Sequence, residues 1–389
     1  MKTEQLSGGD MKRITLFYLL FFVLLVGCSY DERTEPNREM SILAFIVADN
    51  DLDDHALYIE QDIIKGLKSC PCGTEVVLYM DRLNTEPTIK KYTLTNDGKI
   101  GVNNIKTYPE QCSTSPQVFS NVLSEMRRNS SGKRYSLIYW SHGSGWLPAS
   151  GSTKTSTRAI GMDQGVSMNI YDMANSIQSI EPAALIVLDA CYMGCAPVAY
   201  DLRDAADYLI SSPTNMPGVG FNYDKMLPYL LECSEQSLSC SLDLFKESNN
   251  SNVYGDSASF AIASVVKCGE MEKLASRMRE VVQSGKDSVN TDLIQSFDFD
   301  QSHLYYDLEN YISEISLDAE SLRAFREQMN FTIIKAVNTS KIWSQNQSGL
   351  ISKAVSRFSG LSTYIPGLGN SYYDWAFSKT TWYSNVYEK

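Results

Sequence analysis

The sequence predicts an α/β protein with a mostly parallel β-sheet flanked by helices and an α-rich C-terminal extension packed on it. Two observations carry this prediction. Apolar runs of strand length alternate along the chain with segments of helical periodicity, which is the order of repeated strand–helix–strand crossovers. The chain of 389 residues is also 43% hydrophobic, which is enough to bury a large core.

The expected strands are apolar or β-branched runs, and they occupy residues 41–48, 74–81, 135–140, 184–188, 207–212 and 258–266. The run at 87–94 alternates more and suits an exposed strand. Helices are expected at residues 52–67, 118–127, 172–180, 198–206, 270–283, 304–315 and 321–337. A strand-like stretch at 359–366 leads into an aromatic tail, and we expect that tail to pack against the main body.

The N-terminus reads as a targeting segment. Lys12 and Arg13 precede an apolar stretch at 14–26, which is short for a membrane span. Gly27 and Cys28 follow and resemble the lipobox of bacterial lipoproteins, in which the cysteine is lipidated and becomes the mature N-terminus. An ordinary signal peptide with a chance cysteine is the alternative.

The predicted organisation is therefore a lipoprotein signal peptide at 1–28, a tether at 29–39, an α/β domain at 40–267 and a helical and mixed region at 268–389. A lipid anchor implies the cell envelope, as an outer-membrane lipoprotein facing the periplasm or the cell surface.

Charge and cysteine usage exclude some classes. The chain has 46 acidic and 34 basic side chains, and this balance argues against a nucleic-acid partner. It is compatible with cationic substrates, although an acidic surface usually serves solubility. The cysteines after Cys28 form no disulfide framework or zinc motif, and a bond between Cys233 and Cys240 stays open.

A histidine and a cysteine at the ends of two expected strands are the candidate reactive groups. His142 follows the run 135–140 and is flanked by glycines, whereas His55 and His303 lie near helix starts and read as surface residues. Cys191 follows the run 184–188. Open α/β sheets bind ligands beyond the carboxyl ends of their strands, so neighbouring parallel strands would bring the two together. A thiol beside an imidazole is a nucleophile beside its base.

Several ordered motifs resemble the clostripain-like cysteine peptidases (family C11), relatives of caspases, legumains and gingipains. They are ADNDL at 48–52, WSHGSGW at 140–146, TRAIGMD at 157–163, DACYMG at 189–194, VAYDLR at 198–203 and PGVGF at 217–221. The resemblance implies a caspase-like fold and a catalytic dyad of His142 and Cys191 acting on peptides through a thioester. It also implies an oxyanion site at the N–H groups of Gly143 and Cys191.

The resemblance also raises substrate preference and processing. Such enzymes commonly cleave after Arg or Lys, and Asp189 matches a position that contributes acid to the substrate pocket; the alternative is a carboxylate that caps local backbone. Residues 213–223 lack the second acid, with Asn215 and Val219 in the corresponding places. Self-cleavage in the loop after the histidine would use Lys154 or Arg158.

No cofactor is required, and no metal ligands are assigned. Calcium dependence occurs among relatives, with unknown sites here. Asp49, Asn50 and Asp51 read as helix caps and dipole partners, and a metal site is the alternative. Two other functions stay open: a catalytically silent binding lipoprotein of the envelope, and a transpeptidase or amidase that uses the same dyad.

Overall fold

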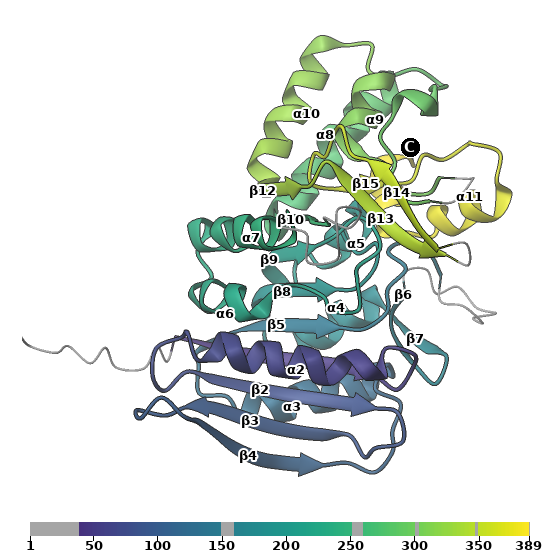
Figure 1. Ribbon diagram of the computed structural model, residues 1–389. Helices are drawn as coiled ribbons and strands as arrows, with labels where there is room; N and C mark the ends of the chain where they lie inside the picture. The colour runs from purple at the N-terminus through teal and green to yellow at the C-terminus, as the bar shows by residue number, and fades with distance from the viewer. Residues whose placement is uncertain (1–38, 149–158, 251–259, 300–302, 347–348, 389) are drawn as a thin grey trace, which may run out of the picture. The chain divides into compact units, whose positions relative to one another are not determined.

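The centre of the fold is a nine-stranded sheet. The computed structural model describes residues 39–148, 159–250, 260–299, 303–346 and 349–388. The strands of the sheet are β1 (Met40–Ala48), β2 (Glu75–Arg82), β3 (Thr88–Leu94), β4 (Ile100–Thr107), β5 (Arg134–Trp140), β8 (Ala183–Asp189), β9 (Ala206–Ser211), β10 (Ile262–Lys267) and β12 (Ile333–Asn338). Their order is β12-β10-β9-β8-β5-β1-β2-β3-β4 (Figure 1).

The five central strands run parallel, and two antiparallel strands extend the sheet at each edge. The predicted fold class is therefore confirmed. Strands covered on both faces need continuous apolar sequence, and β1 shows this, because every residue from 42 to 48 is fully buried.

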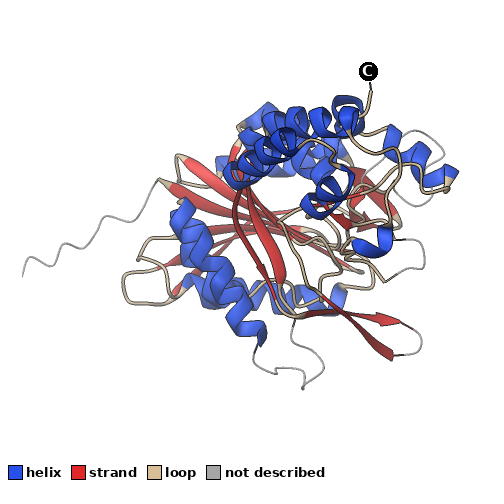
Figure 2. Cartoon of the chain, turned by 90° about the horizontal axis from the view of Figure 1, so that it is seen from above, coloured by secondary structure: helices blue, strands red, loops and turns tan. Residues whose placement is uncertain are grey.

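Helices cover both faces of the sheet (Figures 1 and 2). One layer holds α2 (Asp53–Leu67), α6 (Tyr223–Glu232) and α7 (Glu235–Asn250). The other holds α3 (Pro116–Arg128), α4 (Ile170–Ile180), α5 (Ala196–Asp201), α8 (Met271–Ser284) and α12 (Thr381–Val386). Helix α3 shows why they form: a proline opens it, and Phe119, Val122, Leu123 and Met126 bury one stripe against the sheet.

The smaller elements lie around this sandwich. Hairpin β6 (Ala159–Asp163) and β7 (Val166–Asn169) follows the histidine loop. The C-terminal part adds β11 (Tyr306–Asp307), α9 (Leu308–Ile315), α10 (Ala319–Thr332), hairpin β13 (Lys341–Asn346) and β14 (Gly349–Ala354), β15 (Ser362–Thr363) and α11 (Ser371–Ser378). Single 3-10 turns occur at Cys268–Glu270 and Thr291–Leu293.

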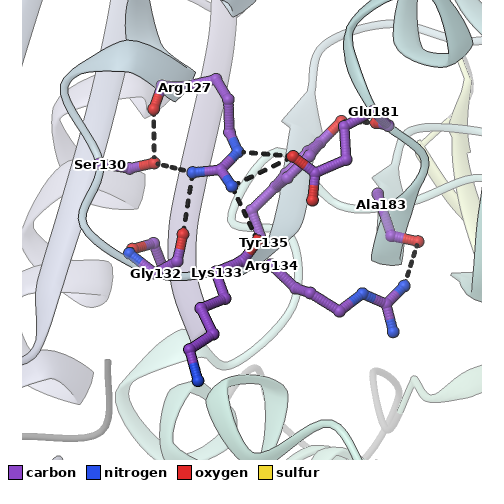
Figure 3. A network of polar contacts seen from close by, with 9 residues as sticks. Arg127, Ser130, Gly132, Lys133, Arg134, Tyr135, Glu181 and Ala183 are labelled. Atoms are coloured by element: carbon purple, nitrogen blue, oxygen red, sulfur yellow. Dashed lines mark hydrogen bonds and ion pairs between the residues drawn. The ribbon is translucent and has the colours of Figure 1, made fainter. Parts of the chain in front are cut away.

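A polar network joins the elements at the amino end of β5 (Figure 3). The Arg127 guanidinium donates to Glu181 Oε2 at 3.1 Å, to Gly132 O at 2.9 Å and to Lys133 O at 2.8 Å. It also donates to Ser130 Oγ at 3.1 Å. One side chain thus fixes the end of α3, the turn into β5 and the start of β8 together.

The C-terminal part differs from expectation in one respect. The predicted helix at 321–337 ends at Thr332, and β12 continues from Ile333 as an edge strand beside β10. Strand β12, which follows the predicted boundary at 267/268, pairs with β10, which precedes it, and the division of the chain there stays a prediction. The aromatic tail packs as expected, with Phe377 and Trp382 fully buried.

Residues 1–38 lie outside the described part, and so do the predicted signal peptide and Cys28. Among the described residues, no helix is long and apolar enough to cross a membrane. All eight described cysteines carry free thiols, including Cys233 and Cys240.

Candidate active site

The ends of β5 and β8 bring the histidine and cysteine loops together. Trp140 pairs with Asp189 in the parallel register, and His142 and Cys191 each follow two residues later. A Cβ atom on Gly143 would lie 2.7 Å from the Cys191 carbonyl oxygen, so the two loops pass closer than a side chain permits. The predicted meeting of the two loops is therefore present, and no hydrogen bond joins the His142 ring to Cys191 Sγ.

The Cys191 thiol is held by backbone of the loop that follows β9. The Met216 N–H donates to Cys191 Sγ at 3.2 Å, and the thiol lies 3.8 Å from the Met216 carbonyl oxygen. Burial raises the pKa of Cys191, and the Met216 N–H only partly offsets this. The resting thiol is therefore protonated at neutral pH and needs a base.

The His142 ring contacts a carboxylate that sequence reasoning did not assign to the site. His142 Nε2 lies 2.7 Å from Asp51 Oδ1, in the loop after β1. This hydrogen bond lowers the pKa of Asp51, which keeps that carboxylate charged. A charged acceptor favours the proton on Nε2, and this tautomer leaves Nδ1 with a free lone pair. The pattern ADNDL gave the only sequence signal, since it placed acids at a third strand end.

The residue after Cys191 has strained backbone. Tyr192 has φ +64°, a region that side chains other than glycine seldom adopt. Its ring stacks on Tyr305 with centroids 4.4 Å apart, and the Tyr305 hydroxyl donates to Ser144 O at 2.6 Å. Trp146 is fully buried and donates from Nε1 to Leu304 O at 3.1 Å. The C-terminal part thus supports both loops.

The expected oxyanion donors lie in this junction. Within the described residues, the N–H groups of Gly143 and Cys191 donate to no backbone carbonyl outside the helices and strands, so neither is committed to a backbone partner there. Ser144 N–H and Gly161 N–H bond across to Ala159 O and His142 O, and these bonds fix the histidine loop on β6.

The Asp189 side chain is buried and does not line the cavity beside Cys191, where a substrate-binding acid was expected. Its side chain is 1% exposed, and Oδ2 accepts from Phe221 N–H at 3.0 Å and from the Tyr223 hydroxyl at 2.8 Å. Gly220, at φ +62°, passes so close that a Cβ would lie 2.1 Å from Oδ2. Burial raises the pKa of Asp189 to about 7. The geometry therefore favours the alternative, a carboxylate that holds the loop at 220–223.

A cavity of about 230 Å³ opens beside Cys191. Its described lining is Cys191, Asn215, Met216, Pro217, Gly218, Phe260, Trp343 and Ser344, and Asp189 is not part of it. Hairpin β13–β14 supplies one wall, where Asn215 Nδ2 donates to Ser344 Oγ at 2.6 Å and Trp343 packs edge-on against Phe260. The sequence gave no signal for this hairpin.

The other predicted residues lie elsewhere. The His55 ring packs against Gly218 at the rim of the cavity, while His303 Nδ1 bonds to the buried Asp298 at 2.5 Å. The candidate cleavage residues Lys154 and Arg158 lie outside the described residues.

The fold and this pair of loops define the class: a caspase-like α/β protein with the histidine and cysteine of a cysteine peptidase at adjacent strand ends. The chain belongs to the clostripain family, because the model of that family matches residues 44–389.

Individual proteins of the clostripain family are also similar to this chain in sequence and in fold. Clostripain of Hathewaya histolytica is 25% identical over 222 residues, which is 49% of this chain and 42% of clostripain, so the match spans less than half of that relative. The solved structure of an inactive zymogen C11 protease from Parabacteroides distasonis superposes with a TM-score of 0.79 at 25% identity, over 91% of this chain and 99% of that one. A secreted C11 cysteine protease from Bacteroides thetaiotaomicron, in complex with an irreversible peptide inhibitor, gives 0.77 at 25% identity, over 90% and 98%.

Proposed function

We propose that this protein is a cysteine endopeptidase in which Cys191 is the nucleophile and His142 the general base. The observation that carries the proposal is the close packing of the two loops, with Gly143 against the Cys191 carbonyl. His142 takes the thiol proton, and the sulfur attacks the scissile carbonyl to form a thioester while the proton passes to the amine leaving group. Water then hydrolyses the thioester and restores the thiol.

Two further features support this chemistry. The N–H groups of Gly143 and Cys191 would stabilise the oxyanion. Asp51, whose side chain is 82% exposed, acts as a positioning residue that favours one His142 tautomer through its contact with Nε2. The protonated thiol of the resting state makes the base essential.

The test compares cleavage of a peptide library by wild type, Cys191→Ala, His142→Ala and Cys233→Ala. The first two variants should lose at least about 10³-fold in kcat/KM, because each removes one partner of the dyad. Cys233→Ala is the matched control, since it removes a thiol that does not line the cavity beside Cys191, and it should cleave like wild type. A wild type that cleaves nothing and whose Cys191 resists a thiol-directed peptide probe would instead support the silent binding lipoprotein.

We further propose that the cavity beside Cys191 binds the side chain that precedes the cleaved bond, and that it selects an uncharged residue there. Phe260, Trp343 and Met216 give it apolar walls, and Asn215 and Ser344 offer neutral polar groups. The expected preference for Arg or Lys rested on Asp189, which does not line this cavity and whose Oδ2 is bound by Phe221 and Tyr223.

Asn215→Asp provides the decisive comparison. A carboxylate in this wall should raise kcat/KM for Arg and Lys substrates about tenfold, because a partly buried ion pair is worth more than 1 kcal/mol. Asn290→Asp, which adds the same charge outside the cavity, should leave the profile unchanged. A wild type that already prefers Arg or Lys would refute the neutral pocket.

Processing and anchoring complete the proposal. One solved relative is described as an inactive zymogen. In this chain, self-cleavage at Lys154 or Arg158 would convert an inactive precursor into the active enzyme. Purified protein should then split there, and Cys191→Ala should stay whole.

Lipidation of Cys28 would hold the enzyme in the cell envelope. Cys28→Ser should then shift the protein from the membrane fraction to the soluble fraction.

A further inference from the structure

A second cavity, of about 600 Å³, lies in the C-terminal part of the chain and includes neither His142 nor Cys191 in its lining. The 3-10 turn at Thr291–Leu293, helix α9 and the end of β14 all contribute to its wall. Its volume is that of a ligand pocket, for which about 300–1,000 Å³ is usual. The chemistry proposed for His142 and Cys191 gives this cavity no role.

One residue of the wall is an imidazole that a buried carboxylate holds in place. His303 lines the cavity, and its Nδ1 lies 2.5 Å from Oδ1 of the fully buried Asp298. The other oxygen, Asp298 Oδ2, accepts from the N–H groups of Leu304 at 2.6 Å and Tyr305 at 2.8 Å. A carboxylate acceptor places a proton on Nδ1, so Nε2 is the ring nitrogen left for a ligand. Within the described residues, this Nε2 makes no hydrogen bond.

The charged side chains of the cavity are separated by segment. Lys353 on β14 and Arg357 just after it contribute two cations. Asp292 in the 3-10 turn and Glu314 on α9 contribute two carboxylates. Among the residues that the structure describes, Arg357 and Glu314 take part in no ion pair, so both charges are available to a ligand. A ligand with one negative and one positive group would complement both sides.

We propose that this cavity binds a short peptide by its two free termini. The C-terminal carboxylate would lie at Lys353 and Arg357, because a guanidinium can hold a carboxylate with two parallel hydrogen bonds. The N-terminal ammonium would lie at Asp292 and Glu314. His303 Nε2 can accept a peptide N–H in the neutral ring. An apolar ligand would instead leave these charges desolvated and without partners.

The cavity is joined to the catalytic loops through Asp298. The Lys353 ammonium donates to the Asp298 carbonyl oxygen at 2.6 Å, and the Asp298 carboxylate binds the Tyr305 N–H. Tyr305 in turn stacks on Tyr192 and donates to Ser144 O. A peptide held by Lys353 would therefore steady the support of both loops, a consequence that rests on the proposed function. An endopeptidase releases peptides with free termini, so this ligand would be one of its products.

Calorimetric titration of the full-length Cys191→Ala variant with trialanine tests the site without turnover. We expect one peptide per chain. N-acetyl-trialanine amide, which lacks both charges, should bind at least tenfold more weakly, and so should acetate and inorganic phosphate. Arg357→Ala and Glu314→Gln, each added to Cys191→Ala, should weaken trialanine binding at least about fivefold, because each removes a partner of one terminus. Neither side chain is buried, so both variants should fold.

Arg323→Ala and Glu320→Gln are the matched controls, since both side chains are exposed on α10 and neither lines the cavity. Both should bind trialanine like their parent. The proposal is overturned if the parent binds no trialanine at millimolar concentration, if the uncharged peptide or phosphate binds as tightly, or if Arg357→Ala binds like its parent.

With Cys191 intact, trialanine should raise kcat/KM for a longer peptide at least about twofold, and Arg357→Ala should lose this effect. Equal inhibition of both proteins would place trialanine at Cys191 and overturn the proposal, and an unchanged kcat/KM would overturn the link to the catalytic loops. A protein that binds trialanine in this cavity but cleaves no peptide would refute the proposed function alone.

Discussion

At the scale of single residues, the histidine loop can pack against the cysteine loop because position 143 is a glycine. There is no room for a Cβ atom at that position. An added Cβ would lie 2.7 Å from the Cys191 carbonyl oxygen, 2.9 Å from Ala190 Cβ and 2.9 Å from Met193 Sδ. Two of these atoms belong to backbone or a short side chain and have little room to yield. The histidine loop would therefore have to move away from the cysteine loop.

Gly143→Ala should accordingly lower kcat/KM at least about 10²-fold and destabilise the fold by about 1–3 kcal/mol, because overpacking forces backbone shifts. Peptide cleavage and urea unfolding would measure the two effects. Gly269→Ala is the matched control, since its Cβ would meet nothing within 4 Å. Equal activity of the two variants would show that the close approach is not needed for catalysis.

The residues of the dyad could be proposed from sequence because each follows a buried strand directly, and parallel neighbours must end at the same edge. Asp51 and the lining of the cavity could not. The contact between Asp51 and His142 depends on the path of the loop after β1, and Trp343 reaches the cavity from 152 positions beyond Cys191 in a hairpin with no apolar pattern. The sequence left two roles open for Asp189, because its partners, Phe221 and Tyr223, come from a loop whose path sequence does not determine.

At the scale of elements, the end of the sheet opposite the active site is held by the network around Arg127 (Figure 3). The Arg127 guanidinium donates hydrogen bonds to four residues, which lie in the α3–β5 turn and at the end of α4. The Arg127 side chain is 19% exposed. Its neighbour Arg128 is 67% exposed and pairs only with Glu125 on the same helix.

Arg127→Ala should therefore lower the free energy of unfolding by about 1–3 kcal/mol, because it leaves partly buried acceptors without a charged donor. Arg128→Ala is the matched control and should cost no more than about 0.5 kcal/mol, as exposed ion pairs do. Urea denaturation of both variants measures the difference. Similar losses would mean that the network contributes no more than a surface ion pair.

The elements that the sequence predicts well are those with a buried face, because burial requires apolar residues at regular positions. Strand β1 is almost wholly apolar because helices cover both faces of the sheet, and α3 shows a clear apolar stripe. The missed elements lack such a pattern. Strand β4 is largely exposed, α6 contains Pro228, and β12 was read as a helix because the pairing of Ile333 with Val266 is not encoded locally.

At the scale of the whole molecule, buried carboxylates without cationic partners set the response of stability to pH. Burial raises the pKa of Asp189 to about 7 and that of Asp307 to about 6, although backbone N–H groups bond to both. The ordinary pKa of an aspartate is 3.8, so the folded state binds more protons than the unfolded chain between about pH 4 and pH 7. Their contribution to stability is fully present below pH 4 and is lost as the pH rises through these folded values.

The urea midpoint should consequently be lower at pH 8 than at pH 5, with Asp189 alone accounting for a loss on the order of 3 kcal/mol between these two pH values. Asp189→Asn removes this titration while keeping an acceptor for Phe221 N–H or the Tyr223 hydroxyl, so it should flatten the decline. Asp97→Asn, at a fully exposed acid, should leave the slope unchanged. A decline that is as steep in Asp189→Asn as in wild type would place the responsible carboxylate elsewhere in the fold.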